Sequence, residues 1–303
     1  MKATMTPVSR KVRAYFAPVD RASGTPTPFD PAIAFDFDAP PAPWIALGDV
    51  VKFQRSGTTK VTPLVAGLKG ATVGQCRSVL GTRVGADFLQ WGKLQMALAA
   101  GSQHTNVLAG SPVAVFAGSS TSELVLGAGA VDAFNVGDLV ACDVDYQQQT
   151  GYIGSPIAGT YVKDPADVNR DRDYLRRVTF NVGRVASKTA TALELAQSLI
   201  GGAPATGASV QKVVAFADRE GGSFFQDWSA LFTLEPESGG RVCFYYPRVQ
   251  ACAGSAEKAL PFDTFEANAL HMELIALPVT DTVDREQVVC YRTYYPATGA
   301  DVY

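Results

Sequence analysis

Glycine and proline interrupt this chain so often that few segments are long enough for a regular helix. The 303 residues include 28 glycines and 18 prolines, with short β-branched and aromatic runs between them. Such runs, separated by turn residues, predict strands. Residues 50–55, for example, predict a strand that ends at a turn at Ser56-Gly57. We therefore expect a mainly β protein, with a β-sandwich or barrel, one flanking helix and an inserted small β-barrel domain.

One stretch, residues 87–100, has the pattern of a helix. Its sequence is DFLQWGKLQMALAA, and its apolar residues recur at helical spacing. Asp87 is suited to cap the start, and Gly101 stands where helices commonly end. We expect an amphipathic helix that packs against the core.

The residue composition changes along the sequence and predicts four parts. Residues 1–43 are rich in proline and predict an extended N-terminal arm. Residues 44–116 and 206–296 hold β-branched runs and predict one discontinuous β domain. Closely spaced short strands in residues 117–205 predict an inserted β-barrel domain, and residues 297–303 form a C-terminal tail.

The arm carries aromatic side chains that are costly to leave in water. They are Tyr15, Phe16, Phe29, Phe35 and Phe37. A disordered leader is one interpretation. We favour an arm that becomes ordered on a neighbouring subunit, in which Phe29, Phe35 and Phe37 make inter-subunit contacts.

Charge and hydrophobicity exclude several classes of protein. With 47% hydrophobic and 18% charged residues, the chain is not globally disordered. Its net charge of −3 lacks the basic excess typical of a nucleic-acid-binding protein. We also expect no membrane span and no signal peptide, because no apolar run has the required length.

The inventory of reactive residues argues against an enzyme. Histidine occurs only as His104 and His271, and the five cysteines are widely spaced without a C-x-x-C motif. This pattern favours reduced thiols over a zinc or dithiol site. Phosphate-binding glycine motifs and a G-x-S-x-G motif are both absent from the sequence. We expect no catalytic centre, no cofactor and no metal.

Residues 164–173 are the strongest candidate for a metal site. Asp167, Asn169 and Asp171 have the spacing of the first three ligands of a calcium loop. Arg172 stands where that loop requires glycine, and the final carboxylate ligand is missing. We therefore expect a solvated loop with internal ion pairs.

A charge-dense turn precedes an apolar run in residues 217–248. One interpretation is a hairpin whose apolar face is core and whose loop is solvated. In the other, the loop contacts an adjacent subunit through Arg219 and Glu220 as ion partners, and Trp228 packs beneath it. Both remain open from the residues alone.

Three stretches together resemble the tail tube (major tail) proteins of tailed bacteriophages. They are ADFLQWGKLQMALAAGSQHTNVLAG at 86–110, ADREGGSFFQDWSALFTLEPESGGRVCFYYPRVQ at 217–250 and HMELIALPVTDTVDREQVVCYRTYYP at 271–296. The resemblance covers about two thirds of the chain and lies in the order and texture of its segments. It implies a tail-tube-like β-sandwich or barrel with one flanking helix.

The resemblance also implies a function. Tail tube proteins form hexameric rings that stack into a tube in the virion tail, assembled in the cytoplasm of the bacterial host. The tube holds a tape measure protein, meets tail-end proteins, and passes DNA without specific binding. Residues 117–205 would be an outward-facing addition. The first alternative is a capsid decoration or carbohydrate-binding β protein. The second alternative is an unrecognised hydrolase.

Overall fold

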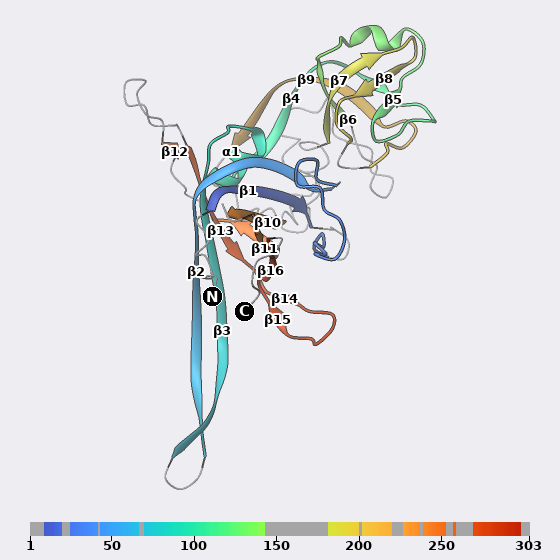
Figure 1. Ribbon diagram of the computed structural model, residues 1–303. Helices are drawn as coiled ribbons and strands as arrows, with labels where there is room; N and C mark the ends of the chain where they lie inside the picture. The colour runs from blue at the N-terminus through green and yellow to red at the C-terminus, as the bar shows by residue number, and fades with distance from the viewer. Residues whose placement is uncertain are drawn as a thin grey trace. The chain divides into compact units, whose positions relative to one another are not determined.

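The chain is mainly β, as the sequence predicts (Figure 1). The computed structural model describes residues 9–19, 25–41, 43–66, 70–142, 181–199, 202–219, 227–236, 239–252, 257–258 and 269–297. The chain divides into two compact units, Met1–Gly101 with Gln226–Tyr303, and Ser102–Phe225. The expected boundaries near residues 117 and 205 therefore lie inside the second unit.

Unit 1 contains ten strands and one helix in its described residues. They are β1 (Ser9–Pro18), β2 (Ile45–Ala66), β3 (Ala71–Phe88), α1 (Lys93–Ala100), β10 (Asp227–Pro236), β11 (Arg241–Ala251), β12 (Glu257–Lys258), β13 (Ala269–Ala276), β14 (Val279–Thr280), β15 (Gln287–Val288) and β16 (Tyr291–Tyr295). Eight strands form one sheet in the order β12-β13-β3-β2-β1-β10-β11-β16, and β14 pairs with β15.

A second pairing closes most of this sheet on itself. Strand β13 pairs with β3 and also with β11, so that Leu274 lies opposite both Val84 and Ala251. Six strands thus form a closed circuit of antiparallel pairs, which makes this part of unit 1 a small barrel.

Alternating side chains fill both faces of the barrel wall. Phe16 packs edge-on against Phe232, with 6.0 Å between ring centroids, and Phe232 packs in the same way against Tyr246. The neighbouring Tyr15 and Tyr245 belong to a second buried cluster. Because successive strand residues point to opposite faces, these adjacent aromatic pairs place a large ring on each face.

The expectation of an N-terminal arm differs from the structure. Ser9–Pro18 forms β1, which lies between β2 and β10 within the sheet. Tyr15 and Phe16 are fully buried by the chain's own barrel. The proline-rich composition of residues 26–43 does not extend back into β1, where alternating apolar residues instead favour a strand.

The helix is shorter than expected and begins later. Residues 87–88 still belong to β3, and α1 begins at Lys93 after Gly92 at its N-cap, without a side-chain cap. Asp87 pairs with Lys52 and accepts a hydrogen bond from His271 at the barrel wall, and so does not cap the helix. The C-terminal end is confirmed: Gly101 has a left-handed φ of 61° and its N–H donates to the carbonyl of Ala97.

Unit 2 is built on a six-stranded antiparallel sheet. Its elements are β4 (Gln103–Ala114), β5 (Glu123–Val125), the 3-10 helix η1 (Ala130–Ala133), β6 (Leu139–Cys142), β7 (Val182–Lys188), β8 (Ala192–Leu195) and β9 (Ser209–Arg219). The strand order is β4-β9-β6-β7-β8-β5. Its core includes the fully buried Leu124, Val140 and Leu193. The long pairing of β4 with β9 explains why this unit is larger than residues 117–205.

Candidate functional site

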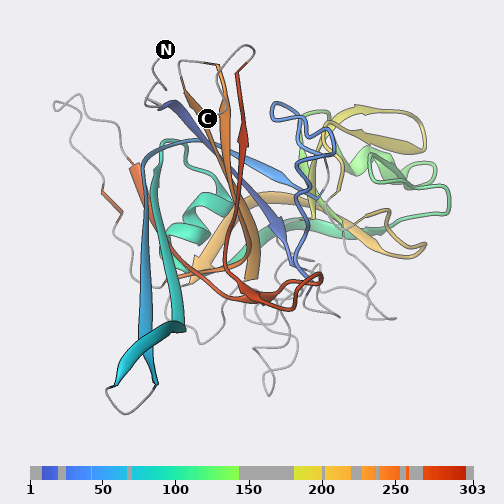
Figure 2. The same ribbon diagram turned by 60° about the horizontal axis from the view of Figure 1, so that its bottom comes forward.

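Strands β2 and β3 extend far beyond the barrel (Figures 1 and 2). Pairing of β3 with β13 ends at Thr82, which lies opposite Gly57 of β2. From there the two strands pair with each other, and with no other described strand, as far as Ala66 and Ala71. We call residues 57–82 the ribbon. At about 3.3 Å per residue, its ten β2 residues span about 30 Å.

The expected turn at Ser56-Gly57 is wrong, because both residues lie inside β2. They pair with Arg83 and Thr82. Glycine and serine are common at turns, yet an exposed two-stranded segment also tolerates them, since no packed layer requires a larger side chain there.

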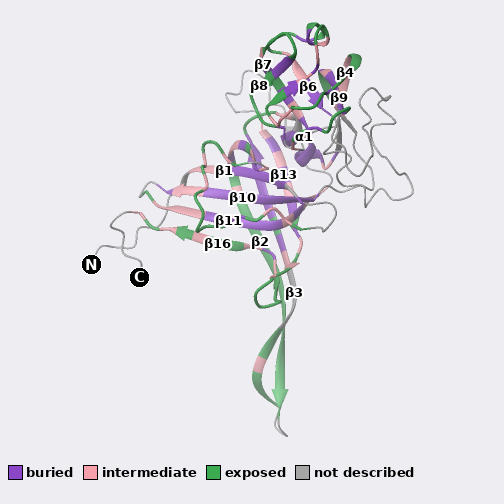
Figure 3. Ribbon diagram, turned by 90° about the vertical axis from the view of Figure 1, so that its right-hand side faces the viewer, coloured by how far each residue is buried: buried purple, intermediate pink, exposed green. Residues whose placement is uncertain are grey.

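Apart from Thr82, which is buried at its base, the described side chains of the ribbon are exposed or half-buried (Figure 3). Its exposed side chains include four large apolar ones, Val61, Leu64, Val65 and Val73. Its sequence carries three cations, Lys60, Lys69 and Arg77, and no carboxylate. A two-stranded ribbon with exposed apolar groups is marginal in water, so these features are typical of a surface that another molecule covers.

The parts of β2 and β3 that adjoin the ribbon, here called its root, are fixed to the barrel by polar contacts. Lys52, with an unusual positive φ of 52°, lies in a bulge and pairs with Asp87 at 2.9 Å. Asp87 also accepts from Nδ1 of His271 at 2.6 Å. Burial raises the pKa of Asp87, but hydrogen bonds from His271 and Lys52 outweigh it and hold that pKa below its usual range. His271 is therefore a hydrogen-bonded strand residue.

Aromatic contacts hold the same root from the other side of the bulge. Phe53 packs on Phe232 and Phe244, with centroids 4.9 and 5.8 Å apart. Arg55 donates from Nε to the hydroxyl of Tyr246, and its guanidinium lies 4.7 Å from the ring centroid of Phe244. The ribbon thus starts from a fixed base.

A second surface is formed where residues 25–41 and 43–44, here called the strap, cross the barrel wall. Three tyrosine hydroxyls donate to strap carbonyls. Tyr15 bonds Phe37 at 2.7 Å, Tyr245 bonds Thr27 at 2.7 Å, and Tyr295 bonds Pro31 at 3.1 Å. Such bonds suit a proline-rich backbone, whose carbonyls have few donors of their own.

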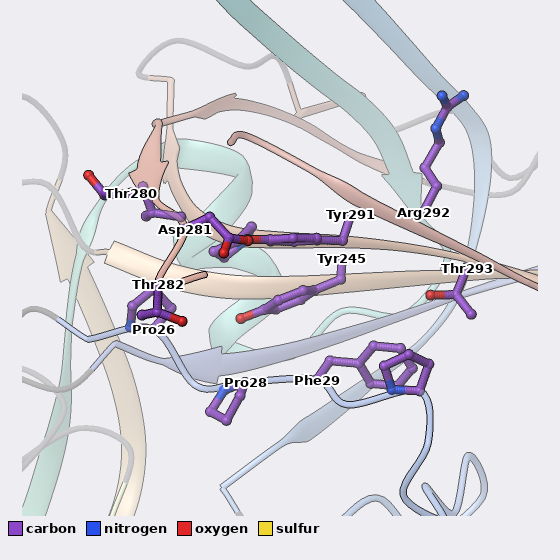
Figure 4. A pocket seen from close by; sticks show the side chains of 13 residues that line it. Pro26, Pro28, Phe29, Tyr245, Thr280, Asp281, Thr282, Tyr291, Arg292 and Thr293 are labelled. Atoms are coloured by element: carbon purple, nitrogen blue, oxygen red, sulfur yellow. The ribbon is translucent and has the colours of Figure 1, made fainter. Parts of the chain in front are cut away.

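The strap, β11, β14 and β16 enclose a pocket of about 400 Å³ (Figure 4). Its walls are mainly rings: four prolines, Phe29, Tyr245 and Tyr291. Tyr245 and Tyr291 stack with centroids 5.9 Å apart, and the hydroxyl of Tyr291 donates to Asp281 at 2.5 Å. The volume lies in the range of small ligand sites.

The side chain of Asp281 is the carboxylate that lines this pocket. The hydrogen bond from Tyr291 lowers its pKa first, and the backbone N–H of Val283, which donates at 2.7 Å, lowers it further. Burial and this carboxylate raise the pKa of Tyr291 to about 12. Asp281 is therefore an anion, and Tyr291 a neutral phenol, at neutral pH.

The predicted contact residues fall in different places. Phe29, Phe35 and Phe37 pack together beside Tyr15 and Trp44 of their own chain, with Phe29 buried and the other two half-buried. An inter-subunit role for these three rings stays a prediction. Their own barrel wall is an ordering surface that the sequence interpretation did not consider.

The two charged contact residues are not brought together by any described contact. Arg219 ends β9 opposite Gln103, and its side chain lies outside the described residues, as does all of Glu220. Trp228 is buried in β10. The loop 164–173 also lies outside the described residues, as does the side chain of His104.

Sequence reasoning missed both the ribbon and the pocket. One signal was available for the ribbon, because residues 51–86 hold six cations and no acidic residue. The pocket gave no local signal, since its walls come from segments more than 200 residues apart.

Several site classes are not found in the described residues. No group of three or more histidine, cysteine, aspartate or glutamate side chains there has the arrangement of a metal site. All five cysteines lie in the described part, and none of them forms a disulfide there. In that part no helix has the length and apolar character that crossing a membrane requires.

No model of a known protein family matches the chain, and no curated protein matches its sequence. The comparisons therefore add neither a family nor a function to this geometry.

Proposed function

We propose that this chain is a structural subunit that assembles with copies of itself, as a tail tube protein of a tailed bacteriophage does. The observation that carries the proposal is the ribbon. It reaches about 30 Å past the barrel at the usual rise of a strand, and it contributes little to the barrel's own core. A segment of this kind gains its stability from a neighbouring molecule.

The chemistry of the ribbon supports a protein neighbour. Val61, Leu64, Val65 and Val73 offer apolar area whose burial is favourable at roughly 25 cal/mol per Å². Among the described strands, β2 and β3 pair along their inner edges only in this segment, so the backbone groups of both outer edges also face a neighbour. The neighbour can therefore cover side chains and pair with an outer edge.

Under this proposal the subunits form stacked, hexameric rings in the virion tail. The ribbon joins one subunit to the next, and the lumen holds a tape measure protein before DNA passes. The barrel supplies the fixed base from which each ribbon projects.

Light scattering combined with negative-stain imaging tests the proposal. We expect rings or tubes from the wild type, and weaker assembly after Leu64→Ser, Val65→Ser and Val73→Ser. The matched control is Val136→Ser with Val214→Ser, which changes equally exposed apolar residues of unit 2. A wild-type chain that stays monomeric at high concentration contradicts the proposal.

The carbohydrate-binding alternative makes the opposite prediction. The stacked tyrosines of the pocket are the observation that favours it, because aromatic faces suit sugar rings. Such a protein would remain monomeric and bind a soluble oligosaccharide with Tyr291 in place. A glycan-array screen of the wild type and Tyr291→Ala distinguishes the two functions.

A further inference from the structure

We propose that the pocket beneath Tyr291 receives a lysine or arginine side chain from the ribbon of a second copy. This inference rests on the proposed function, because it names the surface that the ribbon meets. It assigns a ligand class to the pocket: a cation presented on an exposed strand.

The walls of the pocket suit a cation. Tyr245, Tyr291 and Phe29 line it, and the faces of aromatic rings attract ammonium and guanidinium groups. Asp281 adds a full negative charge at the same place, held by Tyr291 and by the backbone of Val283. Ring faces beside one fixed carboxylate are the usual surroundings of a bound lysine or arginine head group.

The chain's own nearby cation leaves the space open. Arg292 borders the pocket, but its guanidinium points away from the tyrosine pair in Figure 4. On that strand Thr293 borders the pocket too, so β16 supplies a ring and a hydroxyl there. The described residues thus leave Asp281 available to a cation from outside.

The surroundings of the pocket are also acidic. The strap contains three aspartates and no lysine or arginine; Asp38 is paired with Arg13 at 2.5 Å, and Asp30 and Asp36 are exposed. The loop after β14 adds the exposed Asp284 and Glu286, with Arg285 between them. The field around the pocket therefore attracts a basic segment before any contact forms.

The ribbon is the complementary partner within the same chain. Its sequence holds Lys60, Lys69 and Arg77 without a carboxylate, so the segment as a whole is basic. An exposed apolar ribbon with basic residues fits an apolar pocket with an acidic rim. Because ribbon and pocket are different surfaces, the contact is heterologous and can repeat from copy to copy, closing into a ring or continuing as a stack according to the rotation between copies.

Sedimentation velocity of the full chain at three salt concentrations tests the pairing. We expect wild-type association to weaken as salt rises, because exposed charges are screened. Asp281→Asn and Lys60→Gln should each weaken association by about fivefold, the upper effect of one partly exposed pair. Asp132→Asn, an exposed aspartate of unit 2, is the matched control and should leave association unchanged.

Charge reversal gives the stricter test. One protein carries Lys60→Glu, Lys69→Glu and Arg77→Glu, and the other carries Asp281→Lys, Asp284→Lys and Glu286→Lys. Each alone should fail to associate, and a mixture should associate again, because the acidic ribbon then meets the basic pocket and the unchanged basic ribbon meets the unchanged acidic pocket. Failure of the mixture, with both proteins folded by circular dichroism, overturns the pairing.

The remaining outcomes separate this inference from the proposed function. If the wild type assembles but Asp281→Asn assembles equally well at every salt concentration, the pocket assignment is overturned and self-assembly stands. If no variant or wild type assembles, both are overturned. If the wild type remains monomeric and binds a duplex DNA probe through the ribbon, measured by fluorescence anisotropy, the partner is nucleic acid and the inference is overturned.

Discussion

β2 and β3 each pass through two environments, and their two halves differ although the two strands pair with each other in both. In β3, Val84 is fully buried in the barrel wall, whereas Val73 is 68% exposed in the ribbon. Both valines lie where β3 runs antiparallel to β2. Strand-forming residues and paired backbones are thus present in both halves, but only one half has a core to pack against.

The two halves of β2 and β3 therefore have different roles in the stability of the monomer. The barrel half belongs to a closed circuit of strands, so its side chains stabilise the fold. The ribbon half extends past that circuit and leaves its apolar side chains in solvent. Under the proposed function, the ribbon is the part of unit 1 that contacts a second molecule.

The largest expected effect comes from removing the ribbon. Thr58 and Gly81 lie opposite each other, so an Asn-Gly turn can join them in place of residues 59–80. We expect self-association to fall by more than about 100-fold, because the apolar ribbon residues are lost together. The monomer should keep its β spectrum, which circular dichroism measures alongside light scattering.

The control for this truncation is a full-length ribbon with Thr58→Ala and Gly81→Ala, which changes the junction alone. Undiminished assembly of the truncated protein would show that the two halves of β2 and β3 do not differ in function.

Matched valine substitutions test the same comparison on the free energy of unfolding. Val84→Ala should destabilise the monomer by about 2 kcal/mol, since two buried methyl groups are lost and a small cavity remains. Val73→Ala should change it by less than about 0.5 kcal/mol. Urea unfolding monitored by tryptophan fluorescence measures both, and equal effects would contradict the division.

The sequence predicted the structure correctly where a local pattern is compatible with only one kind of structure. The mainly β class and Gly101 at the helix end are of this kind, since turn spacing and a glycine C-cap depend on few residues. The start of α1 was missed because Asp87 is equally suited to a helix cap and to an ion pair with Lys52 beside a hydrogen bond from His271. Only tertiary pairing of β3 with β13 decides between these roles.

The candidate surfaces could be predicted much less well. Proline-rich composition in residues 26–43 obscured β1, whose place in the sheet depends on β10, more than 200 residues later. Ser56-Gly57 is a common turn pair, and nothing local shows that the strand continues through it. The pocket joins Pro26 to Tyr291, a pairing that no short-range pattern contains.

A thiol in the ribbon provides a direct probe of its environment. Cys76 is exposed, whereas burial raises the pKa of Cys243 to about 12 and also raises the pKa values of Cys252 and Cys290. A maleimide should therefore react first at Cys76 in the monomer. We expect this labelling to slow by about tenfold on assembly, measured by mass spectrometry, which corresponds to partial coverage of the ribbon.

Labelling of Cys76→Ser at the same rate would show that another cysteine is the reactive one. Unchanged labelling of the wild type after assembly would place Cys76 outside the contact.

The smallest expected effect concerns Asp87, which lies where the two halves of β3 meet. Its folded pKa is lower than its reference value of 3.8, so the charged carboxylate stabilises the fold above that value. The stabilisation is present near pH 5 and above, and it is lost as pH falls through the folded pKa. Asp87→Asn should lower the free energy of unfolding by about 1 kcal/mol at pH 7, because the asparagine side chain keeps a hydrogen-bonding amide but loses the charge that meets Lys52.

Thermal unfolding from pH 7 to pH 2.5 should show this difference between Asp87→Asn and the wild type shrinking below pH 3.8. Lys52→Gln is the matched change on the other partner, and it should show the same pH dependence with a smaller effect, since the side chain of Lys52 is 79% exposed. If the stability difference between the wild type and Asp87→Asn persists unchanged at pH 2.5, Asp87 stabilises this part of β3 through packing. Its negative charge then makes no contribution to holding the base of the ribbon on the barrel.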